Sequence, residues 1–273
     1  TLKLNHWWSA GTHEQQAEDI NSMFANESVK AIIAHTGGFS AMSVVDLLDF
    51  DLIEKNPKPF MGMSDNTIYQ WAMFTKCNLV GFHCNDLTFG FGQRYIESSE
   101  HTRQYLKQIY IQILTSTQPI GVINPQSQWE CWREGKAKGM LLGGNLKRFM
   151  MLPGTEYFPP LSIFDNAILF WEEIGETYYD ISICLYKMKT LGILDRISGM
   201  IIGQPVWINT YFDEVNHPAL KEVVLDAVSE FQFPILAQVD FGHHISMIPM
   251  PIGIQAQIDA KNLQFMILDA ALI

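Results

Sequence analysis

The chain has 273 residues, 48% of them hydrophobic, and a formal net charge of −11. This apolar content can build the cores of two ordinary domains, and the acidic charge argues against nucleic acid or an anionic membrane as the main partner. No run of about 18 apolar residues occurs, so we expect no transmembrane helix. The four cysteines lack C-x-x-C spacing, which predicts reduced or buried thiols instead of a zinc site or a disulfide framework.

The first predicted helix begins at Thr12, because Thr12 and Gln15 match a capping box and apolar residues follow at helical spacing. The β-branched run at residues 29–34 predicts a buried strand, and the glycine pair Gly37-Gly38 follows it. A glycine pair after a strand usually forms a tight turn, but it can also bring backbone N–H groups close to a ligand. The residues alone leave both interpretations open.

Residues 56–67 have the sequence N-P-K-P-F-M-G-M-S-D-N-T. They predict a short strand at 60–63, a break at Ser64 and a helix over 65–75. A serine at a sharp strand-to-helix turn holds its hydroxyl away from the sheet, beside the first N–H groups of the helix, as in the nucleophile elbow of hydrolases. The alternative is that Ser64 only caps the helix, since serine is a common N-cap. Asn66 also stands where the usual G-x-S-x-G pattern has its second glycine.

The rest of the chain alternates strands with helices, except for a polar, turn-rich stretch at 90–128 that predicts a connector with one helix at 102–114. Further strands are expected at 79–82, 136–142, 167–171, 197–202, 234–239, 252–258 and 263–268, and further helices at 41–48, 143–151, 178–190 and 218–231. This alternation predicts a wound, mostly parallel sheet, in which ligands bind at the carboxyl ends of the strands.

Three predicted strand ends carry residues suited to hydrolysis: Ser64, then Glu172 or Glu173, then His243 or His244. A histidine can take the proton of a serine near neutral pH, and a carboxylate can fix the tautomer of that histidine. The order Ser, Glu, His is that of the α/β-hydrolases. Each residue also has an ordinary explanation, as a solvated charge or part of a Gly-His turn, and the residues alone do not choose within either pair.

A set of short segments occurs in one order over nearly the whole chain: A-G-T at 10–12, V-K-A-I-I at 29–33, G-G-F at 37–39, L-D-F-D-L-I at 48–53, G-M-S-D at 62–65, G-G-N-L at 143–146, I-L-F-W-E at 168–172, G-H at 242–243 and P-I-G at 251–253. In this order they resemble the LD-carboxypeptidase family of serine peptidases, which includes the microcin C immunity peptidases. Each segment is a weak signal alone, but the set is specific.

The resemblance implies an α/β fold with an N-terminal wound (Rossmann/flavodoxin-like) parallel-sheet domain over residues 1–92 and a connector over 93–134. A smaller C-terminal α/β domain over 135–273 would follow, with the active site between the two domains. The N-terminal domain is expected to lack the family's first strand and helix, which would expose a sheet edge. The family is typically dimeric, needs no metal or other cofactor, and is cytoplasmic in its peptidoglycan-recycling members, so we expect a cytoplasmic homodimer.

Within this fold the resemblance implies a catalytic triad of Ser64, Glu172 and His243. It also implies an oxyanion hole formed by the backbone N–H groups of Asp65 and of a glycine in the Gly37-Gly38 turn. The expected substrate-binding residues are Phe39, Asn145 and Trp171. For Trp171 the alternative is ordinary core packing.

The chain departs from the family pattern at several positions near this site. Thr36 stands where the recycling enzymes often carry arginine, Ser40 replaces a glycine, and Cys84-Asn85 replaces Gly-Pro. These departures leave the triad intact but affect substrate choice. A carboxypeptidase needs a cation for the terminal carboxylate of its substrate, and Lys147 and Arg148 are the candidates.

We therefore expect a serine hydrolase whose leading function is removal of the terminal D-alanine from a murein tetrapeptide. The second hypothesis is cleavage of an aminoacyl-nucleotide such as processed microcin C, with Phe39 or Trp171 stacking on the base. A third hypothesis, from another class, is a two-domain protein that binds a peptide or sugar without cleaving it. A complete triad discriminates against this third hypothesis, because a binding protein has no need to keep one.

Overall fold

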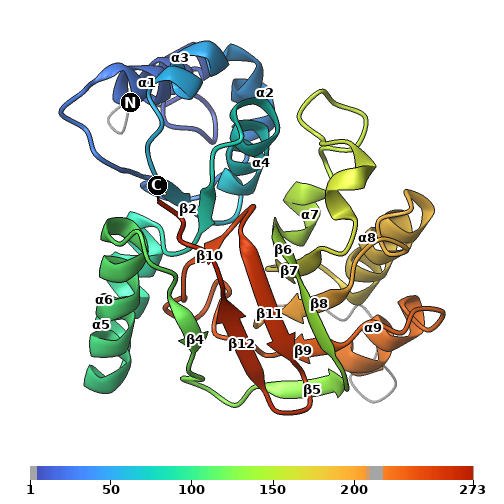
Figure 1. The fold of residues 1–273 in the computed structure, drawn as a ribbon. Helices are drawn as coiled ribbons and strands as arrows, with labels where there is room; N and C mark the ends of the chain where they lie inside the picture. The colour runs from blue at the N-terminus through green and yellow to red at the C-terminus, as the bar shows by residue number, and fades with distance from the viewer. Residues whose placement is uncertain (1–4, 207, 209–217, 273) are drawn as a thin grey trace.

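The computed structural model describes residues 5–206, 208 and 218–272 and arranges them around two β-sheets (Figure 1). The first sheet has four strands in the order β1-β2-β3-β10. Its members are β1 (Ile32–Ile33), β2 (Phe60–Gly62), β3 (Gly81–His83) and β10 (Met250–Pro251). The first three are parallel, and β10 runs antiparallel to β3. Because β10 comes from the far end of the chain, it joins the C-terminal part of the protein to the N-terminal sheet.

Four helices surround this sheet: α1 (His13–Ala25), α2 (Ala41–Val44), α3 (Phe50–Lys55) and α4 (Asn66–Cys77). The predicted capping box of α1 is confirmed, since the hydroxyl of Thr12 accepts from the N–H of Gln15 and the Gln15 side chain accepts from the N–H of Thr12. A short 3-10 turn, Val45–Leu47, separates α2 from α3.

The second sheet has eight strands in the order β4-β12-β11-β6-β7-β8-β9-β5. Its parallel centre consists of β6 (Lys136–Asn145), β7 (Ile168–Glu172), β8 (Gly199–Ile202) and β9 (Ile235–Ala237). Antiparallel strands flank it: β11 (Gln255–Asp259), β12 (Gln264–Ile267) and β4 (Gly121–Ile123) on one side, and β5 (Glu130–Arg133) on the other. The predicted α/β class with a parallel sheet is confirmed. The prediction of a smaller C-terminal domain is wrong, because the C-terminal sheet has eight strands and the N-terminal sheet has four.

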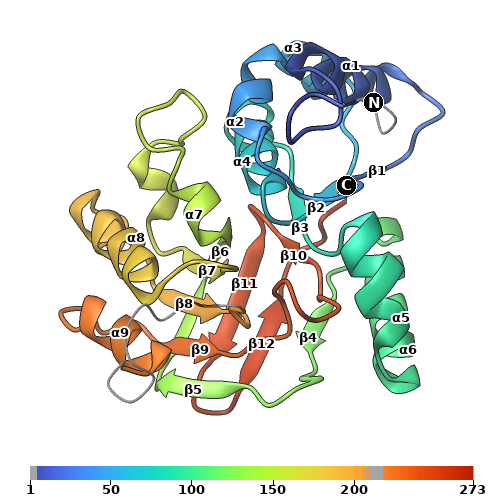
Figure 2. The same ribbon diagram turned by 180° about the vertical axis from the view of Figure 1, so that it is seen from behind.

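Helices lie on two sides of the larger sheet. On one side are α7 (Leu146–Phe149), α8 (Tyr178–Thr190) and α9 (Leu220–Ala227), and on the other side, next to β4, are α5 (Tyr95–Glu97) and α6 (Glu100–Thr115) (Figure 2). A stretch of π-helix, Leu87–Arg94, leads into α5, and a 3-10 turn, Leu161–Phe164, precedes β7. The predicted connector at 93–134 thus also supplies β4 and β5 to the edges of the C-terminal sheet, and the domain boundaries stay a prediction.

The elbow helix α4 contacts the C-terminal part of the protein directly. The indole N–H of Trp71 donates to the carbonyl of Gly143 over 2.9 Å, and the N–H of Asn145 donates to the hydroxyl of Thr67 over 3.0 Å. Trp71 also packs on Phe149 with ring centroids 4.7 Å apart. Aromatic pairs of this kind contribute about 0.5–1.5 kcal/mol beyond the area they bury. These contacts fix the start of α4 against the carboxyl end of β6. Within the described ranges, no helix is long and apolar enough to cross a membrane.

Candidate active site

Ser64 lies in the short turn between β2 and α4. Its φ is +60°, in the left-handed region, where a residue other than glycine costs on the order of 1–3 kcal/mol. The strained backbone expected of an elbow at this position is therefore confirmed. The capping alternative is wrong, because the N-cap of α4 is Asp65 and this helix has no side-chain capping bond.

The Gly37-Gly38 turn lies directly against Ser64. A Cβ atom placed on Gly37 would come within 2.7 Å of the Ser64 Cβ, 3.0 Å of its Oγ and 3.6 Å of the Asp65 backbone nitrogen, so only glycine fits there. In the described part of the chain, no backbone carbonyl accepts a hydrogen bond from the N–H of Gly37, Gly38 or Asp65. Asn66 ties the turn to the elbow, because its side-chain N–H donates to the carbonyl of Thr36 over 3.1 Å. The turn thus brings N–H groups that donate to no described backbone carbonyl close to the serine.

Glu172 and His243 form a buried pair on the other side of the site. Glu172 is the last residue of β7 and is fully buried, and its Oε2 lies 2.6 Å from Nδ1 of His243. Gly242 permits this placement, because its φ is +142° and a Cβ there would lie 2.5 Å from the carbonyl oxygen of Gln204. Among the described residues, the second ring nitrogen of His243, Nε2, is buried and has no hydrogen-bond partner. It does not bond the Ser64 hydroxyl in this structure and stays available to accept a proton.

The pair shifts the pKa of both of its members. Burial alone would raise the pKa of Glu172, but the charge and hydrogen bond of His243, helped by His83, hold this pKa well below its usual value. Burial alone would lower the pKa of His243, but the Glu172 carboxylate raises it above its usual value. The carboxylate is therefore ionised at neutral pH and stabilises a protonated imidazole.

His83, the last residue of β3, has no role in the sequence-based predictions, although it follows a predicted strand. The ring is fully buried, and its Nε2 lies 3.5 Å from Oε1 of Glu172, longer than a good hydrogen bond. Glu172 thus lies between two imidazoles, with His243 the closer. Position at a strand end was the available signal, but it does not show which carboxylate a histidine will meet.

The structure corrects the expected environment of Glu173. We expected this residue to be solvated or in a peripheral contact, but it is only 2% exposed. Its carboxylate accepts hydrogen bonds from the Asn145 side chain at 2.9 Å, from the Lys147 N–H at 2.8 Å and from the Ile174 N–H at 2.9 Å. Burial and then the nearby Glu172 charge raise the pKa of Glu173 to about 7, although these three donors oppose the shift. Glu173 is thus a buried carboxyl group beside the pair that is partly protonated at neutral pH.

Asn145, a predicted substrate-binding residue, is 2% exposed. Its side-chain N–H groups reach both carboxylates, Glu172 at 3.3 Å and Glu173 at 2.9 Å, and its oxygen accepts from the N–H of Arg148 at 3.1 Å. This placement supports a positioning role for Asn145, and a direct contact with substrate stays a prediction.

The two aromatic predictions have different outcomes. Trp171 is buried to 1% exposure, and its indole N–H points to the sulfur of Met200, so the expected contact with substrate is wrong and the core-packing alternative holds. Phe39 is 74% exposed and lies next to the glycine turn, with the guanidinium of Arg148 5.1 Å from its ring centre. Phe39 can therefore reach a ligand, and Trp171 cannot.

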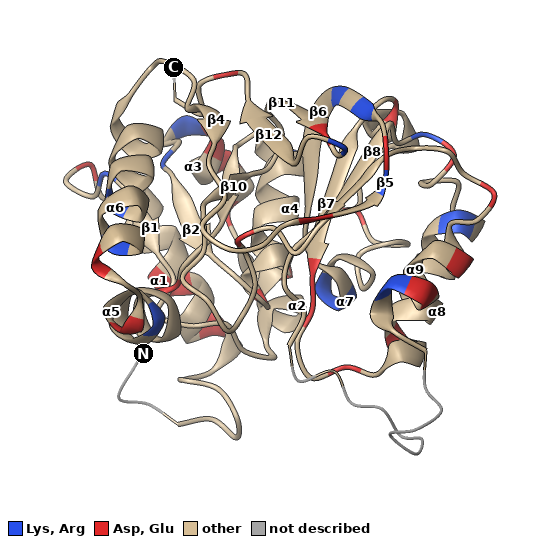
Figure 3. Ribbon diagram, turned by 90° about the horizontal axis from the view of Figure 1, so that it is seen from below, with Lys and Arg blue, Asp and Glu red and all other residues tan. Residues whose placement is uncertain are grey.

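The two candidate cations on α7 differ in a similar way. The ammonium of Lys147 is paired with Glu176 at 2.6 Å, away from the glycine turn. The guanidinium of Arg148 lies 3.3 Å from the Asp65 carboxylate and donates to the carbonyl of Gly38 over 3.3 Å. Figure 3 shows the basic residues of α7 beside the acidic residues that follow β7. Of the two, only Arg148 lies against the turn that flanks Ser64.

Comparison with known proteins matches both parts of the chain to the domains of one protein family. Residues 2–84 match the model of the LD-carboxypeptidase N-terminal domain, and residues 138–258 match that of the LD-carboxypeptidase C-terminal domain. The probable murein peptide carboxypeptidase of Bacillus subtilis is 29% identical to this chain over 96% of the chain and 78% of its own length. The microcin C7 self-immunity protein MccF of Escherichia coli is 26% identical over 94% of the chain and 78% of its own length.

Solved structures are similar in fold. MccF in an inactive mutant apo state superposes with a TM-score of 0.88 at 22% identity, covering 99% of this chain and 85% of that one. An MccF-like protein from Bacillus anthracis superposes with a TM-score of 0.80 at 27% identity, covering 97% of this chain and 84% of that one. With both domain models matched in order and relatives aligned over nearly its full length, the chain belongs to the LD-carboxypeptidase family of serine peptidases.

Proposed function

We propose that this enzyme hydrolyses an amide bond with Ser64 as nucleophile, His243 as general base and Glu172 as the carboxylate that orients the base. The observation that carries the proposal is the buried 2.6 Å pair between Glu172 Oε2 and His243 Nδ1, which leaves Nε2 of the same ring free. A carboxylate on one ring nitrogen fixes the tautomer whose other nitrogen accepts a proton. The strained elbow at Ser64 supplies the matching nucleophile.

In this mechanism the Ser64 hydroxyl attacks the substrate carbonyl while its proton moves to His243 Nε2. The Glu172 carboxylate stabilises the imidazolium that forms, and the imidazolium then protonates the departing amine. The negative charge on the carbonyl oxygen would be bound by the N–H groups of Asp65 and of Gly37 or Gly38, which have no backbone acceptor within the described residues. Water, activated by the same histidine, releases the acyl group from Ser64.

We propose murein tetrapeptide as the substrate, with release of its terminal D-alanine. The carboxypeptidase named among the relatives supports this choice. For the terminal carboxylate, Arg148 is the better of the two expected cations, because its guanidinium lies against the Gly38 carbonyl in the turn beside Ser64, whereas the Lys147 ammonium lies with Glu176. We further propose, from the resemblance, that the enzyme works as a cytoplasmic homodimer. Light scattering of the purified protein tests the oligomer, and a monomer at working concentration would refute it.

A second candidate function is cleavage of an aminoacyl-nucleotide. The observation that favours it is Phe39, which is 74% exposed beside the glycine turn and can stack on a base. Structures related by fold have been solved in complex with glutamyl sulfamoyl guanosine and with aspartyl sulfamoyl adenosine. In this function the bond broken would link the amino acid to the nucleotide analogue, and the same three residues would act.

One experiment separates these functions. The purified protein is incubated with a murein tetrapeptide and, separately, with an aminoacyl sulfamoyl adenosine, and the products are identified by mass spectrometry. Loss of one D-alanine supports the carboxypeptidase, and release of the amino acid from the nucleotide supports the second candidate. A fluorophosphonate probe tests for an activated serine. Absence of both cleavage and labelling at Ser64 would overturn the proposal and favour a protein that binds without cleaving.

A further inference from the structure

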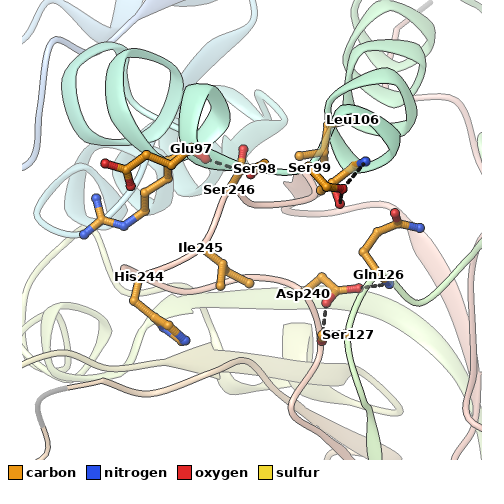
Figure 4. A pocket seen from close by; sticks show the side chains of 12 residues that line it. Glu97, Ser98, Ser99, Leu106, Gln126, Ser127, Asp240, His244, Ile245 and Ser246 are labelled. Carbon is orange, nitrogen blue, oxygen red and sulfur yellow. Dashed lines mark hydrogen bonds between the residues drawn. The ribbon is translucent and has the colours of Figure 1, made fainter.

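A cavity of about 270 Å³ lies between the segment that leads into α6 and the loop that follows His243 (Figure 4). Most of the residues that line it carry polar or charged side chains. The lining residues are Arg94, Glu97, Ser98, Ser99, Thr102, Leu106, Gln126, Ser127, Asp240, His244, Ile245 and Ser246. None of these residues belongs to the proposed triad or oxyanion hole, so the cavity is a separate compartment beside the catalytic residues.

Arg94 is the one permanent cation in the described cavity wall, and no described carboxylate pairs with its guanidinium. Among the described residues it forms no salt bridge, and the one hydrogen bond that its side chain donates there is a long one, 3.4 Å, to the carbonyl of Phe89. The guanidinium also lies 5.9 Å from the Phe89 ring centre. The ammonium of Lys147 and the guanidinium of Arg148 are by contrast paired with Glu176 and Asp65. Arg94 therefore retains the planar fork of donors that binds a carboxylate or phosphate in two places.

Two carboxylates share the cavity wall, and their positions limit where an anion can bind. Asp240 is 3% exposed and lies near Ser127 and Gln126, away from His244 (Figure 4). It accepts from the Gln126 N–H at 2.7 Å, from the Trp129 indole at 3.0 Å and from the hydroxyl of Ser127. The other carboxylate, Glu97, is exposed and accepts from the side chain of Gln93. An anion would thus bind at the Arg94 and His244 side of the cavity, away from Asp240.

The cavity also adjoins the catalytic base. His244 lines it, while the preceding residue, His243, turns the other way toward Glu172. The positive charge of Arg94 is close enough to lower the proton affinity of both imidazoles. The residue that follows the proposed base thus lines the cavity, which places the cavity beside a substrate bound at Ser64 and His243.

We propose that this cavity binds a second carboxylate of the substrate and that Arg94 is the residue that recognises it. This carboxylate differs from the one next to the cleaved bond. It would be the carboxylate at the free end of a diamino-dicarboxylic acid side chain in the peptide. The choice of a peptide substrate rests on the proposed function, whereas the anion subsite rests on the Arg94 guanidinium and the cavity.

The test measures binding, so that it does not depend on turnover. Two tetrapeptides are compared by calorimetry on the Ser64→Ala protein, one with a free carboxylate on the diamino acid side chain and one with a carboxamide there. We expect the carboxylate peptide to bind about tenfold more tightly, because a hydrogen-bonded charge pair contributes at least this factor. Adding Arg94→Gln should remove the difference by weakening only the carboxylate peptide, and Arg94→Lys should restore part of it.

Arg196→Gln is the matched control, since it removes the same charge from an arginine that pairs with Asp165 outside the cavity. The subsite is overturned if Arg94→Gln weakens both peptides equally, if neither peptide binds, or if Arg196→Gln has the same effect. It is also overturned as a carboxylate site if Arg94→Gln changes the binding of phosphate-bearing nucleotides but not the binding of the two peptides. If the discrimination holds while the wild-type protein cleaves neither peptide, the subsite stands and the proposed carboxypeptidase function fails.

Discussion

The two sides of the candidate site are built in different ways. The Ser64 side comes from local sequence, a strand, a strained turn and a helix within about a dozen residues, with a glycine turn packed against it. The Glu172–His243 side is assembled from residues 71 positions apart, and both members are buried. The first side positions a nucleophile through backbone geometry, and the second tunes proton affinity through burial and charge. Substitutions on the two sides should therefore affect activity and its pH dependence in different ways.

The largest effect is expected at the nucleophile. Ser64→Ala removes the attacking oxygen and should lower kcat/KM about ten-thousandfold or more, because the other triad members cannot act without it. The melting temperature should stay close to that of the wild type, since the hydroxyl makes no capping bond. A folded variant that keeps more than about a tenth of the activity would show that Ser64 is not the nucleophile.

Glu172→Gln should come next, with a loss of about a thousandfold to ten-thousandfold in kcat. The amide keeps the shape of the carboxylate but favours the wrong tautomer of His243 and no longer stabilises the imidazolium. The acidic limb of the pH profile of kcat/KM should also move to lower pH in this variant. If the variant is folded in a thermal melt and nearly as active as the wild type, Glu172 does not orient the base.

Gly37→Ala tests the backbone side without changing any charge. The added methyl group would come within 2.7 Å of the Ser64 Cβ, so the turn must move away from the elbow. We expect a loss of about a hundredfold in kcat, comparable to the loss of one oxyanion donor. The pH profile should keep its shape, because the Glu172–His243 pair is untouched. A shifted profile would mean that the two sides are not independent.

The pH dependence of the wild type tests the buried side directly. His243 accepts a proton only when neutral, and its pKa is raised by Glu172. Activity should therefore be low at acid pH and rise as pH passes through a value above the ordinary histidine pKa of about 6.5. Below this value kcat/KM should fall about tenfold per pH unit. In Glu172→Gln the midpoint of this rise should move to lower pH. An unchanged midpoint would show that the rise does not report the titration of His243 beside Glu172.

The smallest effect on activity is expected for Glu173→Gln, a few-fold loss, because the hydrogen bonds of Glu173 reach the pair through Asn145 and its charge acts on the pair without direct contact. Its effect on stability is more informative. The folded-state pKa of about 7 exceeds the ordinary 4.5, so the folded protein holds an extra proton between these values and loses stability as pH rises through them.

The raised pKa of His243 also makes the folded protein lose stability as pH rises, at higher pH than Glu173 does. Variant and wild type share this effect, so the test compares their losses of stability. Urea unfolding at pH 5 and pH 8 should show a smaller loss for Glu173→Gln than for the wild type. Equal losses would mean that Glu173 is ionised throughout this range. A larger loss of activity in Glu173→Gln than in Glu172→Gln, with both folded, would reverse their assigned roles.

Features that depend on neighbours along the chain were predictable from the sequence. The capping box at Thr12, the elbow at Ser64 and the strand that ends at Glu172 each rest on short-range constraints, and the structure contains all three. The choice of Glu172 and His243 over their neighbours came from the resemblance, and the geometry that now supports it is a contact between distant segments.

Tertiary structure decided what is buried and what meets across the chain. The strand pattern that contains Trp171 and Glu173 would also fit exposed side chains. In the structure, however, packing against α7 and β8 buries both residues. The late strand β10 joins the N-terminal sheet, which no local pattern indicates. Burial, partner charges and cavity walls depend on contacts between residues far apart in sequence. Local periodicity carries no information about them, and this is why the Arg94 guanidinium with no described carboxylate partner became visible only in the fold.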